Sequence, residues 1–244
     1  MSTRKSKGIE LALKQLVLLP GMDGTGLLFG EFCAALSPEL SATTVSFPTG
    51  RFLSYTELLP LVNAATPKGE AFAILAESFS TPLALAYAAT NPPNLAAVVI
   101  CAGFIRNPIG RWSVMVRPFV RPSLLGLTPP RWFLEFFLVG KNAPLELIHK
   151  IQAVLKDVAP EVLSRRLQAV LDCDSRDDLT RAAIPILYLQ GTNDRLLTES
   201  CRKDISLIRP DVAFAVIPAP HLILQREPQR AANLILAFIQ RLAV

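Results

Sequence analysis

The chain has 244 residues, of which 51% are hydrophobic and 18% charged, and this predicts one globular domain with a large core. The net charge of +5 is modest, and no block of lysine and arginine is interleaved with aromatic residues, which argues against a nucleic-acid partner. Four well-separated cysteines without a C-x-x-C pair, and only two histidines, argue against a structural zinc site. They indicate a reduced, cytoplasmic protein.

The N-terminus combines basic residues with an apolar run. Three of the first seven residues are lysine or arginine, and the run from 11 to 19 follows them. Lys14 interrupts this run, which ends in Pro20-Gly21 instead of a small-residue cleavage site. We therefore expect a basic, disordered leader and then a strand. No stretch is long and apolar enough to span a bilayer.

Short apolar runs then alternate with helical patterns. The predicted strands are 14–19, 42–47, 71–76, 95–101, 184–190 and 212–217. The predicted helices are 28–36, 55–65, the segment from the turn at 76–80 to about 89, and 228–242. Apolar strands that alternate with helices are typical of an α/β protein, in which a doubly wound, mostly parallel sheet carries helices on both faces.

The alternation stops between 101 and 184. Residues 104–145 contain six prolines, both tryptophans, five phenylalanines and six basic residues, against the single acid Glu135. Residues 145–171 have apolar side chains at helical spacing. A segment this long and patterned is not a loop, so we predict a helical cap at about 104–180, inserted into a single domain 1–244 and placed over the carboxyl edge of the sheet.

The aromatic residues of this insertion have two interpretations. They line an apolar substrate channel, or they pack the cap onto the core. The candidate substrate-binding residues are Trp112, Phe119, Trp132, Phe133, Phe136 and Phe137. The arginines beside them are also compatible with weak contact to a membrane surface.

A serine lies in the sharp turn between the third strand and its helix. Ser78 is preceded by Ala76-Glu77 and followed by Phe79-Ser80. A nucleophile in such a turn needs small residues two positions before and after it, and Ala76 and Ser80 meet this requirement. The helix N-terminus also offers backbone N–H groups to an oxyanion. An ordinary helix cap is the competing interpretation.

A glycine-rich loop, Pro20-Gly-Met-Asp-Gly-Thr-Gly26, follows the first strand. It places the Met22 N–H where it can point at a reacting carbonyl, and the Phe79 N–H is the candidate second donor. A phosphate-binding loop is the alternative. The glycine spacing differs from the dinucleotide fingerprint, and no Gly-Lys-Ser/Thr follows, which argues against that alternative.

An acid and a histidine follow the last two strands. Asp194 lies in the turn after 184–190, and His221 in the loop after 212–217. The second histidine, His149, has a helical context in the cap and is expected to be a surface or packing residue. The competing acids lie in or beside a helix end and are expected to be solvated; they are Asp172, Asp174, Asp177 and Asp178.

The order Ser, Asp, His, each directly after a strand, resembles the α/β-hydrolase superfamily. The loop L-P-G-M-D-G-T-G, the turn E-S-F and the turn G-T-N-D-R-L resemble its small capped esterases, over about residues 14–242. The resemblance implies an α/β-hydrolase fold of about six core strands with an inserted helical cap. It also implies site roles: Ser78 as nucleophile, Asp194 as acid, His221 as base, and the Met22 and Phe79 N–H groups as oxyanion hole.

The chain departs from the superfamily pattern near the nucleophile. Pro20 stands where relatives often have a histidine, and Ser80 and Thr81 replace glycines that are common after the serine. The predicted function is a serine hydrolase that cleaves carboxylic esters or thioesters of apolar acyl groups, with no metal and no cofactor. An acyltransferase on the same fold and a non-catalytic binding protein for a small hydrophobic ligand remain alternatives. The sequence does not predict an oligomeric state.

Overall fold

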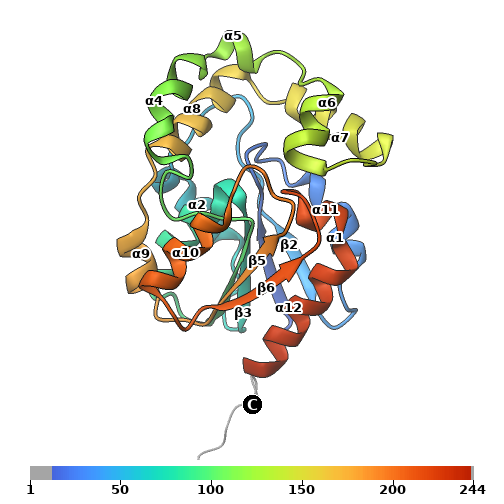
Figure 1. Cartoon of the computed structure of the whole chain (residues 1–244). Helices are drawn as coiled ribbons and strands as arrows, with labels where there is room; N and C mark the ends of the chain where they lie inside the picture. The colour runs from blue at the N-terminus through green and yellow to red at the C-terminus, as the bar shows by residue number, and fades with distance from the viewer. Residues whose placement is uncertain (1–12, 243–244) are drawn as a thin grey trace, which may run out of the picture.

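The computed structural model describes residues 13–242, and the predicted N-terminal leader lies outside them. Six strands form one sheet in the order β2-β1-β3-β4-β5-β6, and every neighbouring pair is parallel. The strands are β1 (Gln15–Leu19), β2 (Ser41–Thr44), β3 (Phe72–Glu77), β4 (Leu95–Cys101), β5 (Ile186–Gly191) and β6 (Ala213–Ile217). The predicted α/β fold, with a parallel sheet of about six strands, is confirmed (Figure 1).

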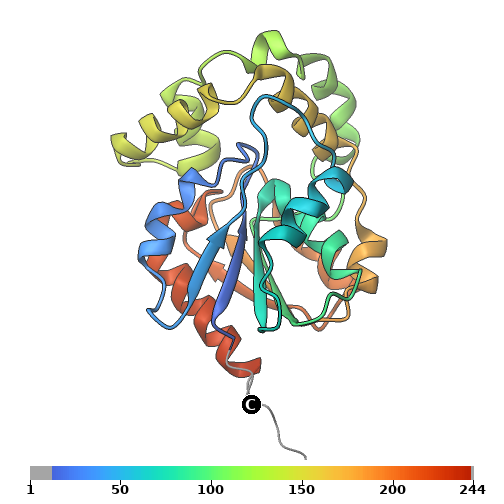
Figure 2. The ribbon, with the colours of Figure 1, turned by 180° about the vertical axis from the view of Figure 1, so that it is seen from behind.

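Helices cover both faces of the sheet (Figures 1 and 2). One face carries α2 (Tyr55–Ala65), α3 (Thr81–Ala88), α9 (Arg176–Arg181) and α10 (Glu199–Ile208). The other carries α1 (Gly30–Ala34), α11 (Ile223–Arg226) and α12 (Pro228–Leu242). Alternate residues of each central strand enter opposite cores, as Val17 and Leu18 of β1 do. Burial on both faces explains why these strands are continuous apolar runs.

The second strand is shorter than predicted. The apolar pattern continues to Phe47, but β2 ends at Thr44, where its pairing with Leu18 ends. Val45 and Phe47 are still buried. The chain of β1 turns away at Pro20, so beyond Val45 the run pairs with the loop after β1. The Val45 N–H still donates to the Leu18 carbonyl at 2.9 Å, and the Phe47 N–H donates to the Gly24 carbonyl at 2.7 Å.

The strand order reverses beside β1, because β2 lies on one side of it and β3 on the other. The loops that follow β1 and β3 therefore leave adjacent strand ends at the carboxyl edge of the sheet. Open parallel sheets place their ligand sites at such a switch point. The loops after β5 and β6 leave the same edge, because all six strands are parallel.

The chain between β4 and α9 forms short helices over this carboxyl edge (Figures 1 and 2). We call residues 106–174 the cap. Its helices are α4 (Ser113–Val116), α5 (Pro122–Leu125), α6 (Arg131–Leu134), α7 (Leu145–Lys156) and α8 (Pro160–Leu171), with single 3₁₀ or π turns between some of them. Leu134, Ile148 and Ile151 form a small core of the cap itself, which packs on Leu28 and Leu222.

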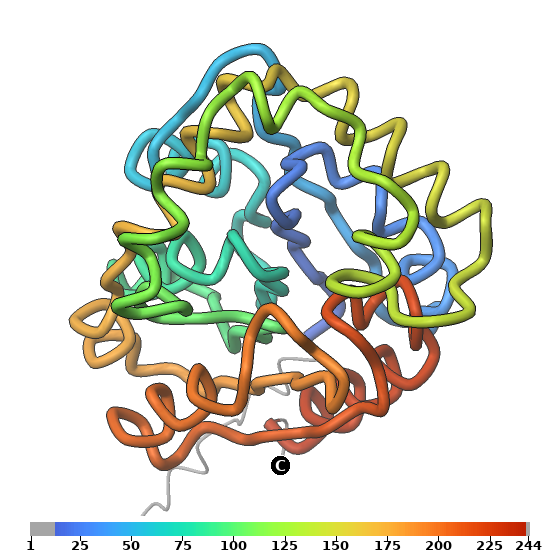
Figure 3. The backbone as a smooth tube through the Cα atoms, turned by 45° about the horizontal axis from the view of Figure 1, so that its top comes forward, coloured from blue at the N-terminus to red at the C-terminus, as the bar shows by residue number. Residues whose placement is uncertain are grey.

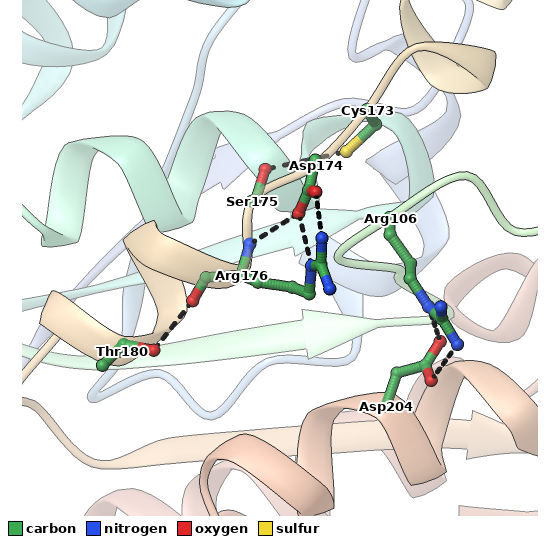
Figure 4. A network of polar contacts seen from close by, with 7 residues as sticks. All are labelled: Arg106, Cys173, Asp174, Ser175, Arg176, Thr180 and Asp204. Atoms are coloured by element: carbon green, nitrogen blue, oxygen red, sulfur yellow. Dashed lines mark hydrogen bonds and ion pairs between the residues drawn. The ribbon is translucent and has the colours of Figure 1, made fainter.

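The two ends of the cap lie side by side (Figure 4). The Asn107 N–H donates to the Cys173 carbonyl at 3.0 Å, and Arg106 forms an antiparallel bridge with Asp174. The Arg106 guanidinium also pairs with Asp204 of α10 at 2.6 Å. These contacts fix where the cap leaves and rejoins the core. Within residues 13–242, no helix combines the length and apolarity needed to cross a bilayer.

Candidate active site

Ser78 occupies the turn from β3 into α3. Its backbone φ is +47°, a left-handed conformation that residues other than glycine adopt rarely. The residues on either side are buried, whereas Ser78 is only half-buried and lines a cavity under the cap. Strained backbone of this kind occurs at functional sites, and here it presents the hydroxyl at the carboxyl edge of the sheet.

The two residues that replace the usual glycines have defined contacts. Ser80 is fully buried, and its hydroxyl donates to the Pro20 carbonyl, so it ties the turn to the loop after β1. Thr81 lies against Gly103, where a Cβ would come within 2.2 Å of the Thr81 hydroxyl oxygen. The larger residue at 81 is therefore accommodated by the absence of a side chain at 103.

The structure brings the three predicted catalytic side chains together. His221 Nε2 lies 3.0 Å from Ser78 Oγ, and His221 Nδ1 lies 2.8 Å from Asp194 Oδ2. The Asp194 carboxylate can only accept, so Nδ1 carries the proton and Nε2 is left to accept from the Ser78 hydroxyl. The three residues come from the loops after β3, β5 and β6.

Backbone contacts fix the acid and the base. Asp194 Oδ1 accepts the N–H groups of Leu196 and Leu197 at 2.8 and 2.9 Å. The Asn193 N–H donates to the Ala219 carbonyl at 3.0 Å and so joins the two loops. A Cβ at position 191 would lie 2.5 Å from that carbonyl oxygen, which explains the glycine there. The carboxylate is thus held on one side while its other oxygen faces the imidazole.

Two backbone donors are available beside the hydroxyl. Met22 lines the same cavity as Ser78, and Phe79 follows Ser78 in the chain. Among residues 13–242, no turn or loop hydrogen bond uses the N–H of Met22 or Phe79. Phe79 lies in the first turn of the 3₁₀ helix Ser78–Ser80, where an N–H has no intrahelical acceptor. Gly24 donates to the Gly21 carbonyl at 3.1 Å and closes the turn that contains Met22.

Arg166 of α8 is a buried cation that the sequence analysis did not single out. Its guanidinium donates to the carbonyls of Met22, Asp23 and Pro48 at 2.9, 2.7 and 2.9 Å. Burial lowers its pKa to about 10, and the nearby Asp23 opposes that shift. The sequence does indicate that this arginine is buried, because position 166 falls on the apolar stripe of the helix, four residues after Val162.

Arg166→Met is expected to lower kcat on a short soluble ester by roughly tenfold. This is less than the roughly 10²- to 10³-fold loss that follows removal of an oxyanion donor itself, because Arg166 positions the Met22 peptide without touching the substrate. KM should change little. Arg165→Met, on the exposed side of the same helix, is the matched control. An unchanged kcat in a folded Arg166→Met protein would contradict a positioning role.

Glu77 is a second buried group that the sequence analysis did not assign. It is only 2% exposed, and Gln225 Nε2 donates to its Oε1 at 3.0 Å. A Cβ on Gly21 would lie 3.4 Å from Glu77 Oε2, so the carboxyl lies against the loop after β1. Burial, with a smaller contribution from Asp23, raises the pKa of Glu77 to about 7. The sequence indicates a buried acid here, because Glu77 directly follows the apolar run 71–76.

The shifted pKa of Glu77 predicts a pH-dependent stability. The unfolded chain releases this proton near 4.5, whereas the folded protein keeps it up to about 7. The stabilisation is complete below pH 4.5, falls as pH rises from 4.5 to 7 and is absent above pH 7. For a shift of this size, the free energy of unfolding falls by about 3 kcal/mol over that range. Glu77→Gln cannot ionise, so its free energy of unfolding should fall less between pH 5 and 8. Urea unfolding measures this.

The exposed Glu70→Gln variant is the control for Glu77→Gln and should follow the wild type. Equal losses of stability in the wild type and in Glu77→Gln would show that Glu77 is charged in the folded protein throughout this range.

A cavity of about 550 Å³ lies between the cap and the three side chains. Ser78 and His221 line it on the sheet side. Aliphatic cap residues form most of the rest of the wall, among them Leu125, Leu127, Leu138, Ile151, Leu155 and Leu163. Few polar groups reach the cavity, so it suits an apolar ligand.

The predicted aromatic wall is largely absent from this cavity. Phe133 lines it, whereas Trp112, Phe119, Trp132 and Phe136 are exposed and do not. Phe137 stacks with Phe133 and Phe136, at ring separations of 4.8 Å. The cap helices here are one turn long with apolar residues on all sides, so the pattern could not distinguish inward from outward positions. The structure corrects this expectation.

The remaining candidates lie away from Ser78. His149 is exposed on α7, and three of the competing acids form ion pairs with arginines; these are Asp172, Asp174 and Asp178. Among residues 13–242, no cluster of three or more His, Cys, Asp or Glu side chains could hold a metal ion. All four cysteines are free thiols.

Known proteins similar to this chain share its fold. A sequence model described as "Alpha/beta hydrolase family" matches residues 16–234. A search of curated proteins returns no significant match. The chain is similar to olei00960, a hydrolase from Oleispira antarctica, with a TM-score of 0.78, 14% identity, and 93% of this chain and 91% of that chain covered.

Two esterase structures are also similar. The esterase from Exiguobacterium antarcticum has a TM-score of 0.75 and 16% identity, with 93% of this chain and 92% of that chain covered. A thermophilic esterase from Thermogutta terrifontis has a TM-score of 0.73 and 19% identity, with 94% and 90% covered. At these identities the likeness concerns the fold alone.

Proposed function

Because the chain belongs to the alpha/beta hydrolase family, we propose that it is a serine hydrolase that cleaves carboxylic esters or thioesters of apolar acyl groups. One observation carries the proposal: Ser78, His221 and Asp194 form a chain of contacts of 3.0 and 2.8 Å, and Ser78 and His221 line an apolar cavity. A binding protein would not need all three groups in this alignment.

The proposed reaction has two steps. His221 Nε2 takes the proton of Ser78 as Oγ attacks the ester carbonyl, and Asp194 stabilises the imidazolium. The Met22 and Phe79 N–H groups donate to the oxyanion. The imidazolium then protonates the departing alkoxide or thiolate, which leaves an acyl-Ser78. Water, deprotonated by His221, attacks this ester and releases the carboxylic acid with Ser78 restored.

The cavity supports an apolar acyl group as the part of the substrate that is bound. Its volume of about 550 Å³ exceeds what a short acyl group fills, and its wall is mostly aliphatic. Each buried methylene contributes roughly 0.8 kcal/mol, about a factor of four in transition-state binding. Selectivity for longer chains should therefore come from the cap residues of the wall.

A panel of p-nitrophenyl esters of increasing acyl length tests the proposal. We expect kcat/KM to rise by roughly fourfold per methylene until the cavity is full. Leu125→Trp should lower the chain length at which kcat/KM is greatest, because the larger side chain occupies the cavity that Leu125 lines. Leu207→Trp, on the exposed side of α10, is the control. A profile that is flat with length, or unchanged by Leu125→Trp, would contradict an acyl site in this cavity.

A further inference from the structure

Exposed apolar side chains concentrate on one part of the cap. Ten of the fifteen exposed large hydrophobic residues in the described chain lie within 112–136. Trp112, Phe119 and Trp132 are 60%, 66% and 66% exposed. Scattered exposed hydrophobic residues are ordinary, but a concentration of this kind marks a surface that binds something. We call the exposed apolar residues of 112–136 the cap face.

The segments that carry the cap face follow one another along the outer side of the cap. The chain from α4 through α5 to α6 forms an arc on the side away from the sheet (Figure 3). Trp132 packs edge-on against Phe133 at a ring separation of 5.9 Å. The apolar residues thus lie on a continuous stretch of surface-forming chain instead of being scattered over the molecule.

The same segment is cationic. Residues 104–145 carry six basic side chains and one acid. Glu135 pairs with Arg131, and Asp172 pairs with Arg117. Within the described chain, the exposed Arg111 and Arg121 have no carboxylate partner.

One of these unpaired cations lies beside an aromatic residue of the cap face. The Arg111 guanidinium lies 5.6 Å from the Trp112 ring centroid. Exposed tryptophan and phenylalanine beside arginine are the composition of segments that bind the interface of an anionic membrane.

The cap face is continuous with the wall of the cavity above Ser78. Leu124, Leu127 and Phe133 are exposed at the surface and also line that cavity. An apolar molecule that leaves a bilayer at this face would therefore meet apolar wall residues before it reaches the three catalytic candidates.

We propose that the cap face docks on a membrane surface rich in anionic lipid and that the acyl substrate enters the cavity from that surface. The second part rests on the proposed function. Two copies of the cap face would bring like charges together, which disfavours a second copy of the chain as the occupant. An anionic membrane offers an apolar layer for the exposed apolar residues and negative charge for the unpaired arginines.

Tryptophan fluorescence of the full chain tests the docking directly, because both tryptophans, Trp112 and Trp132, lie on the cap face. Vesicles of phosphatidylcholine with phosphatidylglycerol should shift the emission to shorter wavelength, protect it from acrylamide and sediment the protein. Pure phosphatidylcholine vesicles should do so much more weakly. Added salt should reduce binding to the anionic vesicles.

Two pairs of variants separate charge from apolar contact. Arg111→Glu with Arg121→Glu should reduce binding to anionic vesicles at least tenfold, since each basic residue near such a surface contributes roughly a factor of five. Its control is Lys14→Glu with Lys68→Glu, exposed at the opposite edge of the sheet. Val114→Asp with Met115→Asp should weaken binding, whereas the control Leu207→Asp should not.

The apolar pair of variants also tests the route of the substrate. Val114→Asp with Met115→Asp should slow turnover of an ester embedded in anionic vesicles and leave turnover of a short soluble ester unchanged. Equal turnover of the embedded ester by this variant and the wild type would overturn entry from the membrane.

Absence of both the emission shift and sedimentation with anionic vesicles would overturn the docking. So would a blue shift that depends on protein concentration without vesicles, because it would identify a second copy as the occupant. Ser78→Ala should bind vesicles like the wild type. Failure of docking therefore leaves the proposed hydrolase untouched, and failure of hydrolysis leaves the docking untouched.

Discussion

Replacement of Ser78 by alanine is expected to lower kcat by roughly 10³-fold or more on every ester that the wild type hydrolyses. The reaction then lacks the atom that attacks the carbonyl, and water must do so without a covalent intermediate. The protein should still fold, because within residues 13–242 the Ser78 hydroxyl has a single hydrogen-bond partner, the His221 imidazole 3.0 Å away. Steady-state rates measure the loss of kcat, and a thermal unfolding curve shows whether the variant still folds.

The control for Ser78→Ala is Ser206→Ala on α10, whose hydroxyl donates to the Lys203 carbonyl of the same helix. It should keep the wild-type rate. A folded Ser78→Ala protein with a rate within a few-fold of wild type would show that another group is the nucleophile, or that the hydrolysis has no covalent step.

Asp194→Asn is expected to lower kcat by roughly 10⁴-fold. The asparagine amide can donate to His221 Nδ1, which favours the tautomer with the proton on Nε2, the atom that must accept from Ser78. The single side-chain oxygen left at residue 194 can still accept the Leu196 and Leu197 N–H groups, so the loop should be kept. Steady-state kinetics with a short ester should show this loss in kcat.

Asp172→Asn is the matched control, because that acid forms an exposed ion pair with Arg117 at the cap. It should leave kcat unchanged. If Asp194→Asn retains most of its activity, the contact of 2.8 Å between Asp194 and His221 does not set the tautomer during catalysis.

The fold and the meeting of three side chains could be predicted because both depend on backbone order. Parallel strands end at one edge, so Ser78, Asp194 and His221, each directly after a strand, had to reach the same edge. Tight turns also need small residues whatever surrounds them, which is why Ala76 and Ser80 were informative. None of this requires knowing how side chains pack.

Contacts between distant segments could not be predicted. Arg166 meets the carbonyl of Met22 across 144 residues of chain, and the helical pattern indicates only that position 166 is buried. The direction of the cap aromatics depends on which side of each one-turn helix faces the cavity, and leucines occupy that side. The end of β2 depends on where its partner β1 turns away, and the apolar pattern of residues 42–47 carries no information about that turn.

Labelling with a fluorophosphonate probe, followed by peptide mapping, tests the central claim most directly. The probe reacts with a serine only where a base and an oxyanion site activate it. We predict one adduct, on Ser78, which is retained in His149→Ala and lost in Ser78→Ala and His221→Ala. An adduct on any other serine, or labelling that persists in a folded Ser78→Ala protein, would contradict the assignment of Ser78 as the nucleophile.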